Sequence, residues 1–250
     1  MGGALVEGML RSGHFATGDI AVSDLDTAAC ARYAEQGAVA AATNVDAVRN
    51  ADIVLVVVKP WIVEAVLKSI ADTIDAQKQS VVVVAAGIAG HDVSKWLANS
   101  SGIVPSAYLA IPNIAAAQRQ SMTFIATIND PNTSHITALF NAVGKTVVTD
   151  ESLLPAATTL ASCGIAYALR YIRAATEGGV ELGFRADTAQ SIVAQTVLGA
   201  VTLLLASKQH AETLIDRVTT PHGVTIKGLN EMEHAGFTSA VIRGLKAGAQ

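Results

Sequence analysis

Ile53-Val54-Leu55-Val56-Val57-Val58 is followed directly by Lys59-Pro60. A run of apolar, mostly β-branched residues without polar alternation is typical of a parallel strand that is buried on both faces. Proline presets the first turn of a helix, so the residues from Pro60 to Ile74 are predicted to be helical. A buried strand that leads straight into a helix indicates a βαβ unit.

The alternation of strand and helix extends from the start of the chain to Thr149. Further strands are predicted at Ile20–Ser23, Val81–Ala85, Tyr108–Ile111, Thr123–Thr127 and Thr146–Thr149. Further helices are predicted at Ala4–Ser12, Thr27–Gln36 and Thr133–Ala142. This pattern predicts an α/β fold with a Rossmann-type, doubly wound, mostly parallel sheet. Residues 1–149 are therefore interpreted as a dinucleotide-binding domain.

The strand pattern ends after Glu151, and residues 150–250 are predicted to form an all-helical domain. Its helices are expected at Pro155–Ala175, Ala186–Ser207, Ala211–Val218, Val224–Glu233 and Thr238–Ala249. We expect Gly178-Gly179, Gly183, Gly223 and Gly236 to interrupt them. Its alanine, leucine and valine content is more than about 100 residues can bury internally, which predicts a homodimer built on these helices.

Composition excludes several classes of function. The chain has 250 residues, of which 51% are hydrophobic and 15% charged, with a formal net charge of -4. Mild acidity without a basic block gives no reason to expect nucleic acid as a partner. No uninterrupted apolar run reaches the roughly 18 residues of a membrane span, so no membrane is expected. Cys30 and Cys163 are isolated, which favours the cytoplasm, and the histidines lack metal-ligand spacing, so no metal is expected.

Three predicted strand ends carry residues suited to a dinucleotide, which binds at the carboxyl ends of parallel strands. After Ser23, the acidic Asp24 can accept a hydrogen bond from a ribose 2′-hydroxyl and repel a 2′-phosphate, which favours NAD; equally, it can cap the next helix. Lys59-Pro60 can face phosphate or ribose, or merely start a helix. Ala86-Gly87-Ile88 has little side-chain bulk, so its backbone can approach a ring, or it forms only a tight turn.

The glycine-rich phosphate loop expected before the first helix is not complete. The chain begins Met1-Gly2-Gly3-Ala4-Leu5 and passes directly into a helical pattern, although a strand and a G-x-G-x-x-G turn normally come first. Loss of that central strand would leave a gap of about 9–10 Å in the sheet. We therefore expect the natural start to lie about ten residues upstream, which mass measurement on the native protein would test.

A second candidate site lies near the end of the chain, in Thr219-Thr220-Pro221-His222-Gly223-Val224-Thr225. One predicted helix ends before this loop and another begins at Val224. The first amides of a helix have no partner within it and carry the positive end of the helix dipole. A loop of hydroxyls and free amides at such a point suits a carboxylate, although an ordinary junction between two helices would have the same pattern.

These segments, in this order, resemble the pyrroline-5-carboxylate reductases, which make proline by reducing a cyclic imine. Met1-Gly2-Gly3-Ala4 is similar to the end of the family's G-x-G-x-M-G-x-A loop, and Val57-Val58-Lys59-Pro60 to its A-V-K-P segment. Asn44 precedes the strand at the family's spacing. Ala86-Gly87-Ile88 and Pro112-Asn113 are similar to A-G-I and to the M-P-N turn beside the nicotinamide.

The resemblance continues through the second half and so covers essentially the whole chain. The segment from Glu177 to Gly183 is similar to a D-G-G-V-x-x-G helix break, and Thr220-Pro221-His222-Gly223-Val224-Thr225 to S-P-G-G-T-T, the substrate-carboxylate loop. His222 replaces a glycine, so that position should no longer adopt a positive φ freely. Further departures are Asp24, where many members have Asn or Arg that favours NADP, and Ile111, Ser162-Cys163-Gly164-Ile165-Ala166-Tyr167, Arg217 and Val224.

The resemblance implies that NADPH or NADH delivers a hydride to the C=N carbon of 1-pyrroline-5-carboxylate, the final step of proline biosynthesis. The implied cofactor-binding residues are Met1, Gly2, Ser23, Asp24, Asn44, Val58, Lys59, Pro60, Ala86, Gly87 and Asn113. The implied substrate-binding residues are Arg217, Thr219, Thr220, Gly223, Val224 and Thr225. Thr225 is expected to lie closest to the imine nitrogen and to be the catalytic residue. The loop would reach the nicotinamide across a subunit boundary, and family members often stack dimers into larger rings.

Several alternatives remain at this level. His222 can donate a proton or face solvent, and Arg217 can pair with the substrate carboxylate or end a helix in solvent. The protein can instead reduce another cyclic imino acid, which His222 and Val224 suggest. It can also be a non-catalytic helical dimer that has lost nucleotide binding, as the incomplete phosphate loop suggests.

Overall fold

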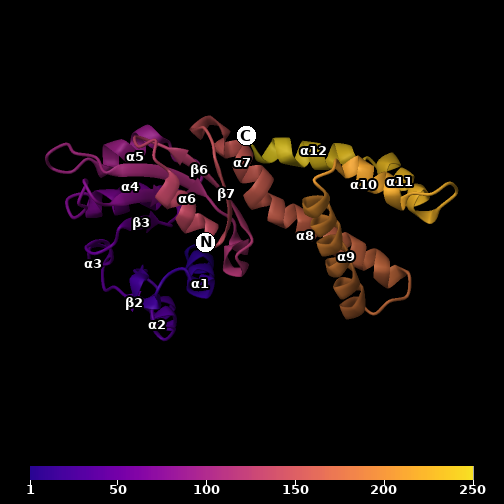
Figure 1. The fold of residues 1–250 in the computed structure, drawn as a ribbon, viewed down its shortest axis with the longest axis horizontal. Helices are drawn as coiled ribbons and strands as arrows, with labels where there is room; N and C mark the ends of the chain where they lie inside the picture. The colour runs from indigo at the N-terminus through magenta and orange to yellow at the C-terminus, as the bar shows by residue number, and fades with distance from the viewer. Residues whose placement is uncertain (250) are drawn as a thin grey trace. The chain divides into compact units, whose positions relative to one another are not determined.

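The structure is a computed structural model that describes residues 1–249, and it divides into two compact units, Met1–Ser162 and Cys163–Gln250. Figure 1 shows the elements of the first unit in indigo to pink and those of the second in orange to yellow. The first unit contains every strand among the described residues, and the second contains only helices and their connections. The predicted order of an αβ half followed by a helical half is therefore confirmed.

The first unit alternates short strands and helices. Its strands are β1 (Ala21–Val22), β2 (Val39–Ala40), β3 (Ile53–Val56), β4 (Ser80–Val83), β5 (Ser106–Ile111), β6 (Ser121–Thr127) and β7 (Gly144–Val148). Its helices are α1 (Gly2–Ser12), α2 (Thr27–Ala34), α3 (Asn44–Val48), α4 (Pro60–Ile70), α5 (Gly90–Leu97), α6 (Ser134–Asn141) and α7 (Leu154–Ala157), followed by a π-helical segment, Thr158–Cys163. β2, α3 and α5 were not predicted. β2 and α3 have only two and five residues, and α5 was not recognised although it is as long as α2 and α6.

The strands form two sheets. β1 and β2 pair in parallel, and β3-β4-β5-β6-β7 form a five-stranded sheet in which only the β5–β6 pair is antiparallel. β1 and β3 do not pair with each other. The run at Ile53 is thus the edge strand of its sheet rather than a central one. Val54 and Val56 are buried, whereas Ile53 and Leu55 are only half-buried, which corrects the prediction of a strand fully buried on both faces.

Helices cover both faces of the larger sheet (Figure 1). One face packs Val81 and Val83 against Val63 and Leu67 of α4 and further apolar residues of α5. The other face packs Val82 and Tyr108 against α1 and α6. Alternate residues of β4 therefore enter different cores, as the period of two in a strand requires. This three-layer arrangement fixes the carboxyl ends of β3 and β4 and the start of α1 relative to one another.

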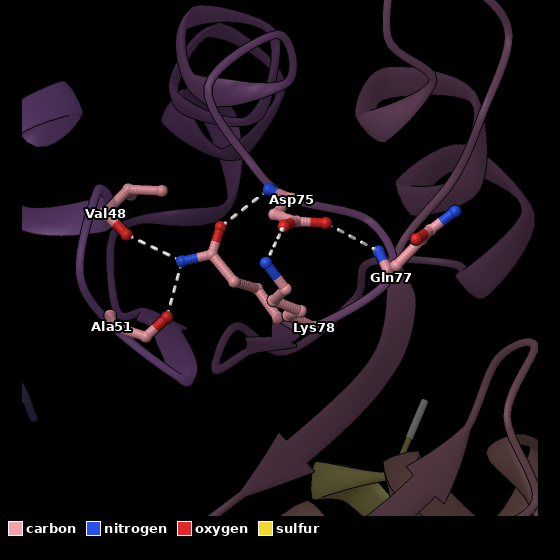
Figure 2. Close-up of polar contacts among 6 residues, drawn as sticks. Val48, Ala51, Asp75, Gln77 and Lys78 are labelled. Carbon is pink, nitrogen blue, oxygen red and sulfur yellow. Dashed lines mark hydrogen bonds and ion pairs between the residues drawn. The ribbon is translucent and has the colours of Figure 1, made fainter.

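At the amino ends of β3 and β4, the buried Gln79 joins the connection between α3 and β3 to the connection between α4 and β4 (Figure 2). The Gln79 side-chain amide donates to the carbonyls of Val48, at 2.7 Å, and Ala51, and its oxygen accepts from the backbone N–H of Asp75. Hydrogen bonds from the Gln77 N–H and from Lys78 lower the pKa of Asp75. Every polar atom of this buried side chain is partnered, so the cluster stabilises the connections that lead into the amino ends of β3 and β4.

The second unit consists of α8 (Gly164–Glu181), α9 (Ala186–Ser207), α10 (Ala211–Val218), α11 (Val224–His234) and α12 (Phe237–Gly248). The predicted break at Gly178-Gly179 is wrong, because α8 continues through both glycines to Glu181. A Cβ at position 179 would lie 3.0 Å from the Cβ of Ala189 on α9. The absence of a side chain there lets the two helices approach closely, and the chain turns only at Gly183, where φ is 102°.

The second unit lacks a core of its own. Within residues 163–249 Ala189 is the only buried residue, while large apolar side chains such as Leu203 and Leu205 are each 62% exposed. Two helical stretches, Glu151–Glu181 and Ala186–Ser207, are long and apolar enough to cross a membrane by length and composition alone. Polar residues are scattered through both stretches, so neither is the uninterrupted apolar run that was looked for in the sequence. A helix that is apolar on all sides requires a covering surface.

Candidate active site

The first candidate element is the start of α1, where the sequence predicts a phosphate site. No side chain caps this helix, and the amides of Gly2, Gly3 and Ala4 donate no hydrogen bond within residues 1–249. A Cβ on Gly3 would lie 2.6 Å from the Tyr33 hydroxyl, and a Cβ on Gly2 would face Val57 at 3.8 Å. The helix start therefore lies between α2 and the end of β3, with free amides suited to a phosphate.

The carboxyl end of β1 brings two predicted residues together. The Ser23 hydroxyl donates to Oδ1 of Asn44, the first residue of α3, at 3.1 Å. Asp24 is exposed, and its Oδ1 accepts from the backbone N–H of Asp26 at 2.9 Å. The cap of α2 is Asp26, whose carboxylate accepts from the amides of Ala28 and Ala29. Asp24 thus does not cap the helix, and its second carboxylate oxygen is left for a ligand.

A cavity of about 250 Å³ opens beside Asp24. Small side chains from α2 and from the end of β2 leave this room, and its lining residues are Asp24, Thr27, Cys30, Ala31, Ala40, Ala41 and Ala42. Sequence reasoning missed all of them except Asp24, because a two-residue strand that ends in Ala40 and is followed by two further alanines has no distinctive pattern. The cavity lies where a doubly wound fold binds the ribose of a dinucleotide.

The remaining predicted cofactor residues lie at the ends of β3, β4 and β5. Lys59 is exposed in the N-cap position of α4, next to the half-buried Val58 and Pro60. Ala86 and Gly87 are exposed after β4, and Gly87 has a φ of 76° with no atom within 4 Å of the place where a Cβ would lie. This loop is open to a flat ring, and only glycine adopts that backbone conformation without strain.

Asn113 differs from the other predicted cofactor-binding residues because its side chain is buried and already forms hydrogen bonds within the protein. Its Oδ1 accepts from the Ala115 N–H at 3.0 Å, and its Nδ2 donates to the Ala161 carbonyl in the π-helical segment at 3.3 Å. Its own N–H donates to the Ser121 hydroxyl. The side chain therefore holds the turn after β5 in place, and contact with a cofactor would have to come mainly from the backbone of this turn.

In the second unit, the predicted substrate loop connects α10 to α11 through a tight turn. The Gly223 N–H donates to the Thr220 carbonyl at 2.9 Å, with Pro221 and His222 between them. His222 has a φ of 63°. A proline followed by a residue with positive φ is the pattern of a type II turn, which explains why glycine suits that position. His222 thus adopts the left-handed conformation that its replacement of glycine was expected to hinder.

Gly223 has a different role from the one predicted for its amide. That amide is used within the turn, so it is not free for a carboxylate, and a Cβ at position 223 would lie 2.5 Å from the Thr220 hydroxyl. The amides of Val224 and Thr225 donate no hydrogen bond within residues 1–249, and no side chain caps α11. These two amides remain as the anion site at the helix start.

The hydroxyls and charges around this helix start also differ in availability. The Thr219 hydroxyl donates to the Asp216 carbonyl at 3.0 Å, whereas the Thr220 and Thr225 hydroxyls make no hydrogen bond in the described part of the chain. Arg217 is exposed in the last turn of α10 and forms no ion pair with any described residue. Two free hydroxyls, two free amides and an unpaired guanidinium can together bind a carboxylate and one further polar atom.

Comparison with known proteins matches a different family model to each part of the chain. Residues 151–250 match the family model described as pyrroline-5-carboxylate reductase dimerisation, and residues 1–87 match that of NADP oxidoreductase, coenzyme F420-dependent. Pyrroline-5-carboxylate reductase 2 of Dictyostelium discoideum is 33% identical over all of this chain and 88% of its own length. The chain belongs to the pyrroline-5-carboxylate reductase family.

Two further comparisons define how far the likeness extends. Pyrroline-5-carboxylate reductase 1 of Dictyostelium discoideum is 37% identical over 98% of this chain, which spans only 46% of that protein's length. The solved pyrroline carboxylate reductase of Plasmodium falciparum with NADP bound is 20% identical and has a TM-score of 0.86, covering 100% of this chain and 92% of that one. The likeness to the solved structure shows the fold of this pyrroline-5-carboxylate reductase family member.

The dimerisation match also accounts for the missing core of the second unit. Residues 151–250 include both helical stretches whose length and composition would suit a membrane. A family domain that associates with a second copy explains why large apolar side chains are exposed in a single chain. The predicted homo-oligomer is supported by this match.

Proposed function

We propose that this protein reduces 1-pyrroline-5-carboxylate to proline with NADH or NADPH, as the last step of proline biosynthesis. The observation that carries the proposal is the uncapped start of α11, where the Val224 and Thr225 amides and the Thr225 hydroxyl lack partners within residues 1–249 in a member of this family. A carboxylate on the amides would leave the hydroxyl for a second polar atom of the same small substrate, such as a ring nitrogen.

The residues of the first unit fit a dinucleotide. The free amides at the start of α1 suit the pyrophosphate, and the cavity beside Asp24 suits a ribose. The open backbone at Gly87 leaves room for a ring. When bound, the reduced nicotinamide supplies a hydride to the C=N carbon.

The protein's own contribution is position and charge placement. The helix start holds the carboxylate and so fixes which carbon faces the hydride donor, and this orientation lowers the entropic cost of the reaction. The Thr225 hydroxyl donates a hydrogen bond to the imine nitrogen, which gains electron density as the C=N bond is reduced and finally takes a proton from solvent. The assembled homo-oligomer would bring the helix start of one copy to the strand ends of another, and the apolar helices would face a second copy rather than lipid.

The proposal is tested by initial rates of NADH and NADPH oxidation with 1-pyrroline-5-carboxylate and with its six-membered homologue. We expect faster turnover of the five-membered ring and formation of proline in equal amount to the cofactor oxidised. A preference for the six-membered ring would favour a reductase of another cyclic imino acid. Absence of oxidation, together with absence of cofactor binding in a nicotinamide fluorescence titration, would favour a non-catalytic helical dimer.

The exposed carboxylate of Asp24 predicts that the protein prefers NADH. We expect Asp24→Asn to lower the ratio of kcat/KM for NADH to that for NADPH about tenfold, because the substitution removes a charge that repels the 2′-phosphate. Asparagine keeps the side-chain oxygen that accepts from the Asp26 N–H. Steady-state rates with both cofactors measure the ratio.

Asp19→Asn is the matched control, since Asp19 is an exposed carboxylate before the amino end of β1, whereas Asp24 follows its carboxyl end. This control should leave the ratio unchanged. A wild-type protein that works better with NADPH, or an Asp24→Asn variant with an unaltered ratio, would contradict the assignment.

A further inference from the structure

Glu151 makes a contact that links two distant parts of the first unit. Its Oε1 accepts from the Gly90 N–H at 2.8 Å, across 61 residues of sequence. Gly90 is buried and is the first residue of α5, and Glu151 lies shortly after β7. A Cβ on Gly90 would lie 2.6 Å from Oε2 of Glu151. The carboxylate thus packs directly on the α-carbon of the glycine.

The contact supplies what α5 lacks at its own start. The N-cap residue, Ala89, has no side chain that can accept a hydrogen bond. A carboxylate at the first amide of a helix satisfies a free donor and interacts favourably with the helix dipole. Glu151 therefore caps α5 from a remote part of the chain.

The loop immediately before α5 is Ala86–Ala89, the segment with the exposed Gly87 backbone. Residues 86–89 donate no backbone hydrogen bond within residues 1–249. After the Val84 N–H, which donates to the Val56 carbonyl at 2.9 Å, the next backbone N–H that donates is that of Gly90 to Glu151. Apart from the apolar packing of Ile88, this bond therefore fixes the far end of the connection. Loss of that bond should let the loop and the first turn of α5 move together.

We propose that Glu151 is a positioning residue for the cofactor, acting by holding the 86–89 loop in the conformation that receives the ring. The inference rests on the proposed function, since it assigns this loop to the dinucleotide site. Glu151 touches neither ligand in this role, and it acts through the backbone of Gly90.

Two variants remove the contact from opposite sides. Glu151→Ala removes the acceptor, and Gly90→Ala introduces a methyl group at the place that the carboxylate occupies. For both variants we expect the KM for the reduced dinucleotide to rise about fivefold to tenfold, with kcat within about twofold of the wild type. The reason is that one hydrogen bond to a charged group, which holds the 86–89 loop in its binding conformation, is lost. Glu151→Gln keeps an acceptor and should restore most of the wild-type KM.

Asp72→Ala is the matched control. Asp72 also accepts a single remote backbone N–H, that of Ser100 at 2.7 Å, just beyond the other end of α5. It should destabilise the protein as much as Glu151→Ala but leave the KM for the dinucleotide unchanged. An unchanged KM in Glu151→Ala, or an equal rise in Asp72→Ala, would overturn the proposal.

Amide hydrogen exchange separates this proposal from the proposed function. Without any ligand, Glu151→Ala should increase exchange in a peptide that covers residues 86–92 and Asp72→Ala should not. Unchanged exchange there would show that Glu151 does not fix the loop, whatever the activity. If the wild-type protein oxidised neither cofactor while exchange rose as expected, the proposed function would fail and the structural coupling would stand.

Discussion

Replacing Thr225 by valine is expected to lower kcat/KM for 1-pyrroline-5-carboxylate by about 10²–10³-fold, the usual effect of removing one donor that stabilises developing charge. Valine has nearly the same shape and keeps the backbone amide, so the anion site at the start of α11 should survive. The Thr225 hydroxyl makes no hydrogen bond within residues 1–249, and its loss should therefore cost little stability. Steady-state kinetics and thermal unfolding measure the two effects.

The control for this substitution is Thr238→Val. Thr238 occupies the same position in α12 as Thr225 does in α11, the second helical residue after a glycine N-cap. Its hydroxyl, however, donates to Oε2 of Glu233 at 2.7 Å and so already has a partner. Thr238→Val should leave kcat/KM within about twofold of the wild type. Equal losses in both variants would mean that the hydroxyl of Thr225 has no special role.

The second large effect is expected from the double substitution Leu198→Glu with Leu205→Glu in α9. The two leucines are seven residues apart, on one side of the helix, and are 58% and 62% exposed in the single chain. If a second copy covers them, two unpaired carboxylates would be buried, which costs several kcal/mol. We expect a smaller species by light scattering and a loss of more than about 100-fold in activity, because the proposed site needs two copies.

The control is Ile103→Glu, which replaces an apolar residue by glutamate on the surface of the first unit. Ile103 is 54% exposed. It should alter neither the mass of the assembly nor the activity. If the double variant kept the wild-type mass and rate, the exposed face of α9 would not be the contact between copies.

The long helices of the second unit could be predicted closely from the sequence. The predicted ranges Ala186–Ser207 and Ala211–Val218 coincide with α9 and α10. Both begin after residues with extended backbone, and α9 ends at Lys208 in the left-handed conformation, so local signals mark their ends. The break predicted at Gly178-Gly179 was wrong because a glycine within a helical pattern can mark either the end of the helix or a close approach of a second helix. Only the position of Ala189 on α9 distinguishes the two cases.

The candidate site was predictable only in part, and the reason is the use of polar groups by the fold itself. The side chain of Asn113 and the amide of Gly223 are polar and well placed in sequence, but each already has a partner within its own unit. A sequence motif does not show whether a polar group already has a hydrogen-bond partner within the fold. Glu151 was not identified at all, because its partner, Gly90, lies 61 residues away and no local pattern records the contact.

Direct transfer of a hydride to an imino acid held by the start of α11 can be followed by isotope transfer. Wild-type protein would be given 1-pyrroline-5-carboxylate and reduced dinucleotide carrying deuterium at the transferable position of C4. We predict proline with a single deuterium at the carbon that was part of the C=N bond, formed far more slowly by Thr225→Val. Proline without deuterium, or no proline from a protein that binds the dinucleotide, would show that no hydride passes directly from the dinucleotide to the imino acid.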